Sequence, residues 1–204
     1  MKKYEFTGET KVSFGRILKR IRALVKIEIL DGTFVSPGDV GGWVETEDNL
    51  DHSGNAWVCG NAKVYGDARV YGDARVYGDA EVCGNAWVYG DAEVYGDARV
   101  YGDARVYGDA EVCGNAWLCG NAKVCGDAEV RKSTHVVTVG PIGSRNDVTT
   151  FFRNKTGTIN VKCGCFIGDV NEFLAKVQVT HGDTKHGQTY RLAAELAIAQ
   201  IDID

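Results

Sequence analysis

The chain has 204 residues, of which 44% are hydrophobic, and its formal net charge is -5 at pH 7. This composition can supply a buried core, and the absence of a run of roughly eighteen apolar residues argues against a transmembrane helix. Residues 41–130 carry sixteen acidic and six basic side chains. Nucleic acid is therefore a disfavoured partner, because an acidic surface repels phosphate groups.

Residues 1–40 are not repetitive, and we expect them to form an N-terminal β cap. Tyr4–Phe6 suits a short strand, whereas residues 15–29 fit either a helical or a strand period. We favour strand, because an element at this end must shield the first coil from pairing with other chains. Four of the basic residues in this stretch form either an anion-binding patch or, as we favour, a solvated face: Arg16, Lys19, Arg20 and Arg22.

Residues 54–130 form thirteen consecutive six-residue units. A short fixed period indicates a solenoid, and a period of six is typical of hexapeptide β-helices. In units such as Ala56-Trp57-Val58, two small or aliphatic residues flank an outward one, which predicts a short strand with Ala and Val inside. The Gly-Asp or Gly-Asn pair that follows suits a tight corner, since these residues tolerate the left-handed backbone conformation.

Three units make a triangular coil of eighteen residues, so the residues that stack on one face can be predicted. Lys63, Glu81 and Arg99 form one column of alternating charge, and Arg75 lies against Glu93. A second column places a tryptophan between two cations: Arg69, Trp87 and Arg105. Four aspartates line one corner, where hydrogen bonds within each turn are favoured over a bound metal: Asp73, Asp91, Asp109 and Asp127.

The same spacing favours free thiols. Stacked residues are eighteen positions apart, and no two cysteines of the repeat have this separation: Cys59, Cys83, Cys113, Cys119 and Cys125. Free thiols are typical of a reducing compartment. The chain also begins with polar residues, unlike a secretory signal. We therefore expect a cytoplasmic protein without a membrane anchor.

The segment GDVGGWVE at residues 38–45, together with the repeat, resembles hexapeptide-repeat proteins found in phages and prophages. The resemblance implies a left-handed parallel β-helix over residues 41–131, although general crossover rules favour a right-handed path. Counting back in sixes places Val44 and Leu50 inside, so one irregular coil precedes the regular ones. The resemblance also implies a homotrimer, which three tryptophans predicted to be exposed on three different faces support: Trp57, Trp87 and Trp117.

The period stops after Arg131, and residues 132–204 predict a small α+β module. We expect a strand at 135–139 and a hairpin at 149–166 that turns at Asn154–Gly157. Asp169 is expected to cap a first helix, whose apolar stripe consists of Val170, Phe173, Leu174 and Val177. A second helix is expected at about 188–201. The mainly β fold class is thus a β-helix with a C-terminal α+β module.

Two stretches of this module could carry chemistry. The loop 140–147 combines glycine N–H groups with the side chains of Ser144, Arg145 and Asn146, which suits an anion such as phosphate or carboxylate. Cys163 and Cys165, with His181 and His186 downstream, could bind zinc, or Cys165 could be a nucleophile with His181 as its base. Buried thiols and surface histidines are the favoured alternative.

The pattern GSRN…CGCF…THG resembles a module found in phage proteins. This resemblance implies no particular activity. We expect neither a metal nor a cofactor. The residues predicted to contact a ligand are Gly143, Ser144, Arg145, Asn146, Cys165 and His181.

Three functions follow as hypotheses. The first is a non-enzymatic binding and assembly protein of a phage-like element, in which a trimeric scaffold presents modules that bind a small anionic, nucleotide-like ligand or a host protein, with a counter-defence role. The second is an acyltransferase, disfavoured because the coils contain no histidine and no inserted loop, while His52 and His135 only flank them. The third is a structural spacer. The sequence VYGDARVYGDAEVCGNAW occurs at 70–87 and again at 100–117, and this shift rotates the copy onto another face, which favours a scaffold.

Overall fold

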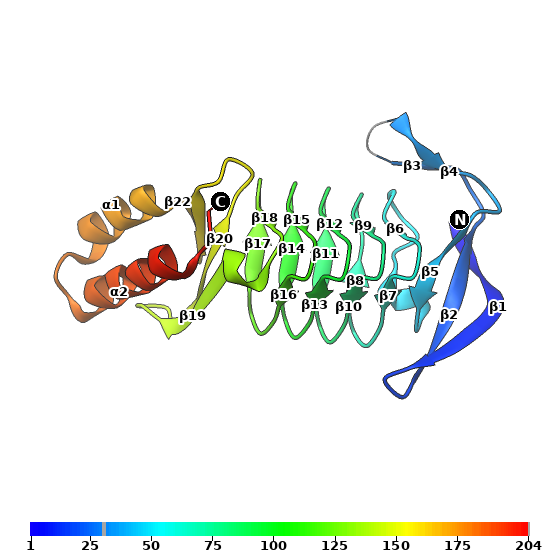
Figure 1. Cartoon of the computed structure of the whole chain (residues 1–204), viewed down its shortest axis with the longest axis horizontal. Coiled ribbons are helices and arrows are strands. Elements are labelled where there is room, and N and C mark those ends of the chain that lie inside the picture. Colours follow the sequence, from blue (N-terminus) through cyan, green and yellow to red (C-terminus); the bar gives the residue numbers. More distant parts are fainter. Residues whose placement is uncertain (30–31, 204) are drawn as a thin grey trace.

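The computed structural model describes residues 1–29 and 32–203. A rod of stacked coils lies between an N-terminal β-hairpin cap and a C-terminal module of a sheet and two helices (Figure 1). The predicted mainly β fold class, a parallel β-solenoid with a C-terminal α+β module, is confirmed. Its left-handed sense stays a prediction from the resemblance.

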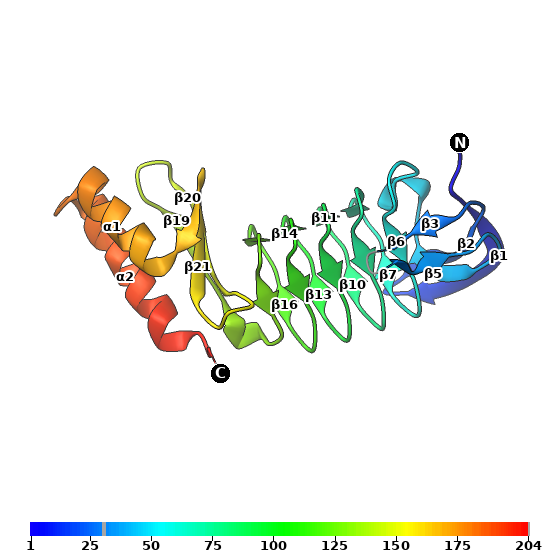
Figure 2. The same ribbon diagram turned by 90° about the horizontal axis from the view of Figure 1, so that it is seen from above.

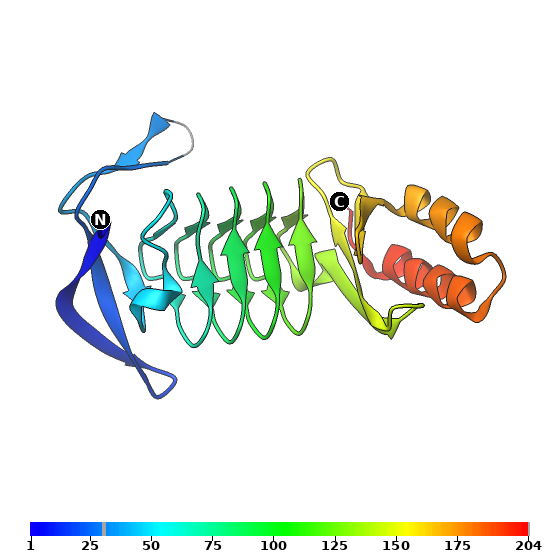
Figure 3. The same cartoon turned by 180° about the vertical axis from the view of Figure 1, so that it is seen from behind.

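The rod consists of short strands that recur every six residues. Each strand pairs in parallel with the strand eighteen residues further on, as Val64 does with Val82. The strands are β6 (Trp57–Val58), β7 (Lys63–Val64), β8 (Arg69–Val70), β9 (Arg75–Val76), β10 (Glu81–Val82), β11 (Trp87–Tyr89), β12 (Glu93–Val94), β13 (Arg99–Val100), β14 (Arg105–Tyr107), β15 (Glu111–Val112), β16 (Trp117–Leu118), β17 (Lys123–Cys125) and β18 (Glu129–Val130). The coils follow one another without an inserted loop (Figure 3).

The three faces of the rod carry different outward side chains. The mixed face is formed by β7, β10, β13 and β16, with Lys63, Glu81, Arg99 and Trp117. The cationic face is formed by β8, β11, β14 and β17, with Arg69, Trp87, Arg105 and Lys123. The acidic face is formed by β6, β9, β12, β15 and β18, with Trp57, Arg75, Glu93, Glu111 and Glu129.

The inward rows of Ala and Val are buried along the whole rod, as predicted. Val94, for example, has no exposed surface. Alternate residues of a strand point to opposite sides, so the period of six fixes which side chains fill the prism. The corner glycines have positive φ, such as 72° at Gly90, where a Cβ would lie 3.0 Å from the backbone N of Gly108 in the next coil. Glycine is thus required both by the turn and by the close stacking.

The predicted columns are confirmed. Lys63 Nζ lies 2.6 Å from a Glu81 carboxylate oxygen, and Arg99 Nε lies 3.7 Å from the other oxygen. Arg105 stacks on Trp87, with 4.9 Å between the guanidinium carbon and the ring centroid. Arg75 pairs with Glu93. All seven cysteines are free thiols.

The N-terminal cap continues the sheet of the mixed face. It contains β1 (Tyr4–Ser13), β2 (Arg16–Ala23), β3 (Ile27–Glu28), β4 (Phe34–Val35), β5 (Val40–Val44) and the 3-10 turn η2 (Glu47–Asn49). The strand prediction over 15–29 is confirmed for β2 and β3. Its basic residues mostly meet acidic or aromatic partners: Arg16 pairs with Glu45, Arg22 with Glu5, and Arg20 lies over Trp43.

The first coil is irregular, as predicted, and it is longer than the others. Val44 pairs with Val64, and Leu50 bridges to Val70, so both pairs span twenty residues rather than eighteen. Val44 and Leu50 are both fully buried. The extra residues lie between Leu50 and Trp57, where the chain passes under the cap.

The prediction that Trp57 is exposed is wrong. Its side chain is only 2% exposed, because the cap covers the start of the acidic face. A Cβ on Gly41 would lie 2.7 Å from the Trp57 ring and 2.6 Å from Ile21, so glycine lets β5 approach both side chains. Trp87 is half-buried and Trp117 is 50% exposed, and the three tryptophans do lie on three different faces.

The C-terminal module is a four-stranded antiparallel sheet with two helices on the side away from the rod (Figure 2). It contains η3 (Ser133–His135), β19 (Val136–Ile142), β20 (Asp147–Arg153), β21 (Ile159–Cys163), β22 (Phe166–Asp169), α1 (Val170–His181) and α2 (Lys185–Gln200). The predicted strand, hairpin and two helices are confirmed, although α2 begins earlier than expected and β22 was not predicted. Asp169 caps α1 by accepting hydrogen bonds from the N–H groups of Asn171 and Glu172.

Strand β20 belongs to both cores. Phe152 is fully buried in the core of the rod, whereas Phe151 is fully buried in the core of the module. Neighbouring side chains of a strand point to opposite faces, so one strand closes the end of the rod and also supports the helices. The module is therefore docked through apolar packing as well as through polar contacts.

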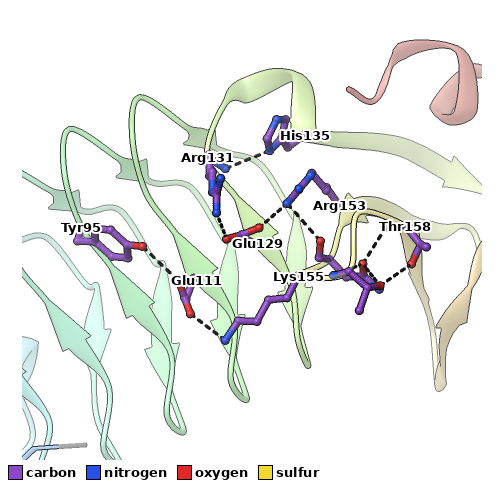
Figure 4. Close-up of polar contacts among 10 residues, drawn as sticks. Tyr95, Glu111, Glu129, Arg131, His135, Arg153, Lys155 and Thr158 are labelled. Atoms are coloured by element: carbon purple, nitrogen blue, oxygen red, sulfur yellow. Dashed lines mark hydrogen bonds and ion pairs between the residues drawn. The ribbon is translucent and has the colours of Figure 1, made fainter. Parts of the chain in front are cut away.

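Ion pairs surround this junction (Figure 4). Arg153 of β20 and Arg131 both contact the Glu129 carboxylate, and Lys155 Nζ lies 2.8 Å from a Glu111 oxygen. Although burial favours the neutral acid, the hydrogen bonds from Arg153 and Arg131 lower the pKa of Glu129. The module thus supplies cations to the end of the acidic face.

Candidate functional site

A pocket of about 360 Å³ lies in the C-terminal module, between α1, α2, the β19–β20 loop and the β21–β22 turn. Its lining residues are Ser144, Arg145, Asp147, Cys163, Gly164, Cys165, Phe166, Phe173, Lys176, Val177, Thr180, His181 and Tyr190. Four of the six predicted ligand contacts line this one pocket: Ser144, Arg145, Cys165 and His181. Their role as ligand contacts stays a prediction.

The other two predicted ligand contacts, Gly143 and Asn146, do not line the pocket. They lie in the β19–β20 loop and shape its backbone. Gly143 has a φ of 72°, and a Cβ there would lie 1.7 Å from the Tyr190 hydroxyl oxygen. Asn146 has a φ of 50°, which asparagine tolerates better than most residues, and its N–H donates to the Gly143 carbonyl at 3.3 Å. Both residues therefore set the path of the loop, while Ser144 and Arg145 between them face the pocket.

Arg145 reaches across the pocket rim to the β21–β22 turn. A Cβ on Gly164 would lie 3.2 Å from an Arg145 guanidinium nitrogen. Cys163 pairs with Phe166, so the turn consists of only Gly164 and Cys165, and glycine at its first position suits a tight hairpin. Within the described residues no carboxylate lies within 4.0 Å of the Arg145 guanidinium. Its hydrogen-bond donors are therefore available to an anion.

Aromatic and aliphatic side chains form the inner wall. The Phe173 ring packs edge-on against Tyr190, with 5.6 Å between the ring centroids. The Phe166 ring lies on Phe173 as well, also with 5.6 Å between centroids. Val177 follows Phe173 by one turn of α1 and is also buried. Burial raises the pKa of Tyr190 to about 12, and the neighbouring Cys163 adds to this shift. The tyrosine is thus a neutral hydrogen-bond donor at pH 7.

Two cations, Arg145 and Lys176, and one carboxylate, Asp147, line the pocket. Lys176 Nζ lies 4.9 Å from the Phe166 ring centroid, and His181 packs beside Tyr190 at 5.6 Å between ring centroids. The Asp147 carboxylate accepts a hydrogen bond from the Val148 N–H, which lowers its pKa, and lies 3.5 Å from Lys123 Nζ. The pocket therefore combines an apolar interior with a rim that carries two cations and one carboxylate.

Three further residues that the sequence did not predict line the pocket: Lys176, Thr180 and Tyr190. The helical period held a signal for two of them, because Phe173, Lys176, Val177, Thr180 and His181 are three or four residues apart and share one side of α1. That pattern was interpreted as core alone. The position of Tyr190 depends on how α2 folds back over the sheet, which no local pattern specifies.

The zinc alternative for these residues receives little support, while Cys165 as a nucleophile stays a hypothesis. Cys163 accepts a hydrogen bond from the Thr149 hydroxyl at 3.3 Å, and His181 and His186 lie 6.1 Å apart between ring centroids. Across residues 1–29 and 32–203, no group of three or more His, Cys, Asp or Glu side chains is arranged to hold a metal ion.

The two histidines at the ends of the rod have structural contacts. His52 stacks on Tyr4, with 4.3 Å between ring centroids, and its Nδ1 accepts from the Lys3 N–H at 3.3 Å. His135 is 2% exposed, and its Nδ1 accepts from the Arg131 N–H. Burial, assisted by Arg153, lowers the pKa of His135. His135 is therefore not open to a substrate, whereas His52 lines a pocket of about 470 Å³ together with Arg69 and Trp87.

The comparison with protein families concerns the rod alone. The family model for the YdcK beta solenoid repeat matches residues 62–78, 68–84, 92–108 and 98–114. The chain is a β-solenoid repeat protein. The matches recur at a shift of thirty residues, like the duplicated sequence, and they include neither the cap nor the pocket. No curated protein matches the chain, and no described helix is long and apolar enough to cross a membrane.

Proposed function

We propose that this β-solenoid is a non-enzymatic binding and assembly protein: the rod associates as a homotrimer, and each C-terminal module binds a small anionic ligand. The observation that carries the proposal is the pocket around Arg145. An apolar interior with a few convergent polar groups is the usual composition of a small-molecule site, and an arginine fork without a carboxylate partner suits a phosphate or carboxylate group.

The aromatic wall narrows the ligand class. Phe166, Phe173 and Tyr190 offer ring surface to an apolar or planar body, while Arg145 and Lys176 attract a negatively charged group. A nucleotide-like anion combines both parts. The resemblance to phage proteins adds the expectation of action in a host cytoplasm, where such a ligand could be sequestered.

Self-association is supported by apolar surface at both ends of the rod. The tip of the β1–β2 hairpin exposes Val12, Phe14 and Ile17, and α2 exposes Leu192 and Leu196. Large side chains gathered in this way commonly mark contact surfaces. Side-by-side copies would bring the modules together at one end.

Native mass spectrometry and calorimetry of the purified protein test the ligand site. The probes are adenosine monophosphate and inorganic phosphate, and the variant is Arg145→Ala. We expect measurable binding of the nucleotide, and a loss of at least tenfold in affinity on removal of the charge-assisted hydrogen bonds. Lys132→Ala, which removes an exposed cation of the same module outside the pocket, should bind like the parent.

Equal binding by Arg145→Ala and the parent would place the ligand elsewhere. If no small molecule co-purifies and neither probe binds, the ligand-binding proposal is wrong and the structural spacer is favoured. Acetyl transfer from an acyl donor by the intact protein would favour the enzyme instead.

A further inference from the structure

Like charges meet in register on two faces of the rod. On the acidic face Glu93, Glu111 and Glu129 follow one another, but each contacts a cation. The cationic face also brings like charges together, and there the cations have fewer partners of opposite charge. Trp87 pairs with Arg69 on one side and Arg105 on the other, and Arg105 pairs in register with Lys123. On the mixed face, by contrast, Glu81 lies between Lys63 and Arg99 and contacts both. Like charges directly opposite on neighbouring strands are destabilising. The cationic column therefore has a like-charge cost, which the stacking of Arg105 on Trp87 offsets in part.

Two members of this column lack an acidic partner. In the part of the chain that the structure describes, neither Arg69 nor Arg105 has a carboxylate within 4.0 Å, and both are exposed. Arg105 lies over the ring of Trp87, and Lys123 lies 3.5 Å from Asp147 at the C-terminal module. The guanidinium groups thus present free donors on an open surface.

A row of opposite charge runs along the corner between the cationic and acidic faces. It consists of one aspartate in each coil: Asp73, Asp91, Asp109 and Asp127. The end members accept hydrogen bonds from Asn55 and Asn160. For the side chains of Asp91 and Asp109, the described residues provide no such bond.

The other two corners are built differently. There, asparagine lies beneath aspartate and donates to it, as Asn61 does to Asp79 at 3.1 Å and Asn85 to Asp103 at 3.0 Å. The aspartate row places four carboxylates over one another in successive coils, whereas one of the other corners has a run of two, Asp79 and Asp97, and the other alternates aspartate with asparagine. The cationic column and the aspartate row thus lie on neighbouring strips of the rod surface. Within each of them, side chains of like charge repel one another.

We propose that the cationic column of one copy docks against the aspartate row of a second, parallel copy. The inference rests on the proposed self-association and assigns the surfaces that perform it. Each contact neutralises two rows that are unfavourable in the single chain. Because the two surfaces differ, the contact is heterologous, and it closes into a ring when the rotation between copies allows.

The positions of the charges along the rod axis support this arrangement. Arg69 and Asp73 belong to the same coil, as do Arg105 and Asp109, and Lys123 and Asp127. Copies related by rotation about an axis parallel to the rod stand at equal height. Arg105 of one copy therefore meets Asp109 of the next, and the cations lie opposite aspartates without a shift in register.

A rigid aromatic strip lies between the two rows. Tyr71, Tyr89 and Tyr107 stack with 4.9 and 5.0 Å between centroids and with their planes within 3° of parallel. The edge of Trp87 packs against Tyr71. Aromatic residues and arginine are enriched in protein interfaces, so this strip suits the centre of the contact, with the ion pairs beside it.

The charge pattern favours a second copy over an extended polyanion. A nucleic acid on the cationic column would lie next to the aspartate row, which repels phosphates. In a ring of rods, one neighbour brings its aspartate row to the cations, and the other neighbour brings its cationic column to the aspartates. Self-complementarity of this kind needs no other partner.

A charge swap tests the docking directly. Arg105→Glu and Asp109→Lys alone should each weaken association at least tenfold, because each places like charges across the contact. The double variant should recover association, since Glu at 105 then meets Lys at 109 of the next copy. Sedimentation velocity at low and high salt measures the change against the 22.1 kDa chain. Exposed charges are screened by salt, so the parent should also dissociate more readily at high salt.

The controls separate the possible failures. Lys132→Glu changes an exposed charge outside the rod and should assemble normally, while thermal unfolding verifies that each variant is folded. Arg105→Gln and Asp109→Asn remove the charges without reversing them, in case a reversed variant does not fold. Single variants that stay assembled, or a double variant without recovery, overturn the docking but leave self-association standing. A parent that is monomeric at low salt overturns both, and ligand binding at Arg145 is then judged by its own titration.

Discussion

The rod and the C-terminal module build their surfaces in opposite ways. In the rod every side chain has an equivalent one coil away, so each outward residue forms part of a column. In the module each contact occurs once, and the pocket forms where two loops and two helices meet. The duplicated sequence shows the consequence, because Trp87 lies on the cationic face and its copy Trp117 on the mixed face.

This difference explains where a specific site can lie. Duplication of six-residue units lengthens the rod without disturbing its fold, because every new coil stacks on the one before it. The same duplication moves an outward pattern from one face to another, so a compact site on the coils would be broken up. The regular part suits stability and assembly, while a unique pocket belongs where the repeat ends.

The largest predicted effect is on the interior of the rod. Val94→Asp places a carboxylate in the prism, where the surrounding side chains are Ala and Val without a polar partner. We expect a loss of several kcal/mol in the free energy of unfolding, measured by denaturant titration. Val179→Asp makes the same change at a valine that is 89% exposed on α1, and it should unfold like the parent. Equal stability of the two variants would contradict the inward assignment.

The second prediction compares Gly143 in the β19–β20 loop of the module with Gly120 at a corner of the rod. Gly143→Ala directs a methyl group to within 1.7 Å of the Tyr190 oxygen, in a backbone conformation with φ 72°. We expect a loss of roughly 2–3 kcal/mol from overpacking and strain. Gly120→Ala carries a similar φ of 60° but meets no atom within 4 Å, so it should cost only about 1 kcal/mol. If thermal unfolding shows equal losses, contact with Tyr190 does not shape the loop.

The sequence predicted the rod much further than it predicted the pocket, for a physical reason. Val64 and Val82 are inward because a local period of six repeats, and no distant contact is needed to place them. Trp57 has the same local pattern as Trp117, yet the cap buries it through Ile21 and Gly41. Local sequence describes the coil, whereas the ends depend on segments that are remote in the chain.

The candidate site divides in the same way. Arg145 and His181 were singled out from separate motifs, and the fold brings both to one pocket. Tyr190 was missed because the hydrophobic period of a helix does not distinguish core from pocket wall. Strand β22 was missed because it is short, lies at the sheet edge and contains Gly168, which weakens a strand signal.

The smallest predicted effect is at the junction of the two regions. Glu129→Gln keeps hydrogen-bonding capacity toward Arg153 and Arg131 but removes the charge that assists those bonds. We expect a loss of about 1 kcal/mol at pH 7. The junction also contains Phe152, the backbone bond from Lys155 to Asp127 and the Lys155–Glu111 pair, so the module should stay docked.

The pH dependence identifies the source of this loss. The pKa of Glu129 is lowered in the folded protein, so its contribution is complete above the unfolded value near 4.5 and disappears as the pH falls through the folded pKa. The stability of the parent and of Glu129→Gln should therefore differ at pH 7 and converge in acid. Denaturant titrations of both proteins between pH 7 and pH 3 measure that difference. A gap that persists unchanged at pH 3 would show that the glutamine disturbs packing at the junction, rather than removing a charge that holds the module to the rod.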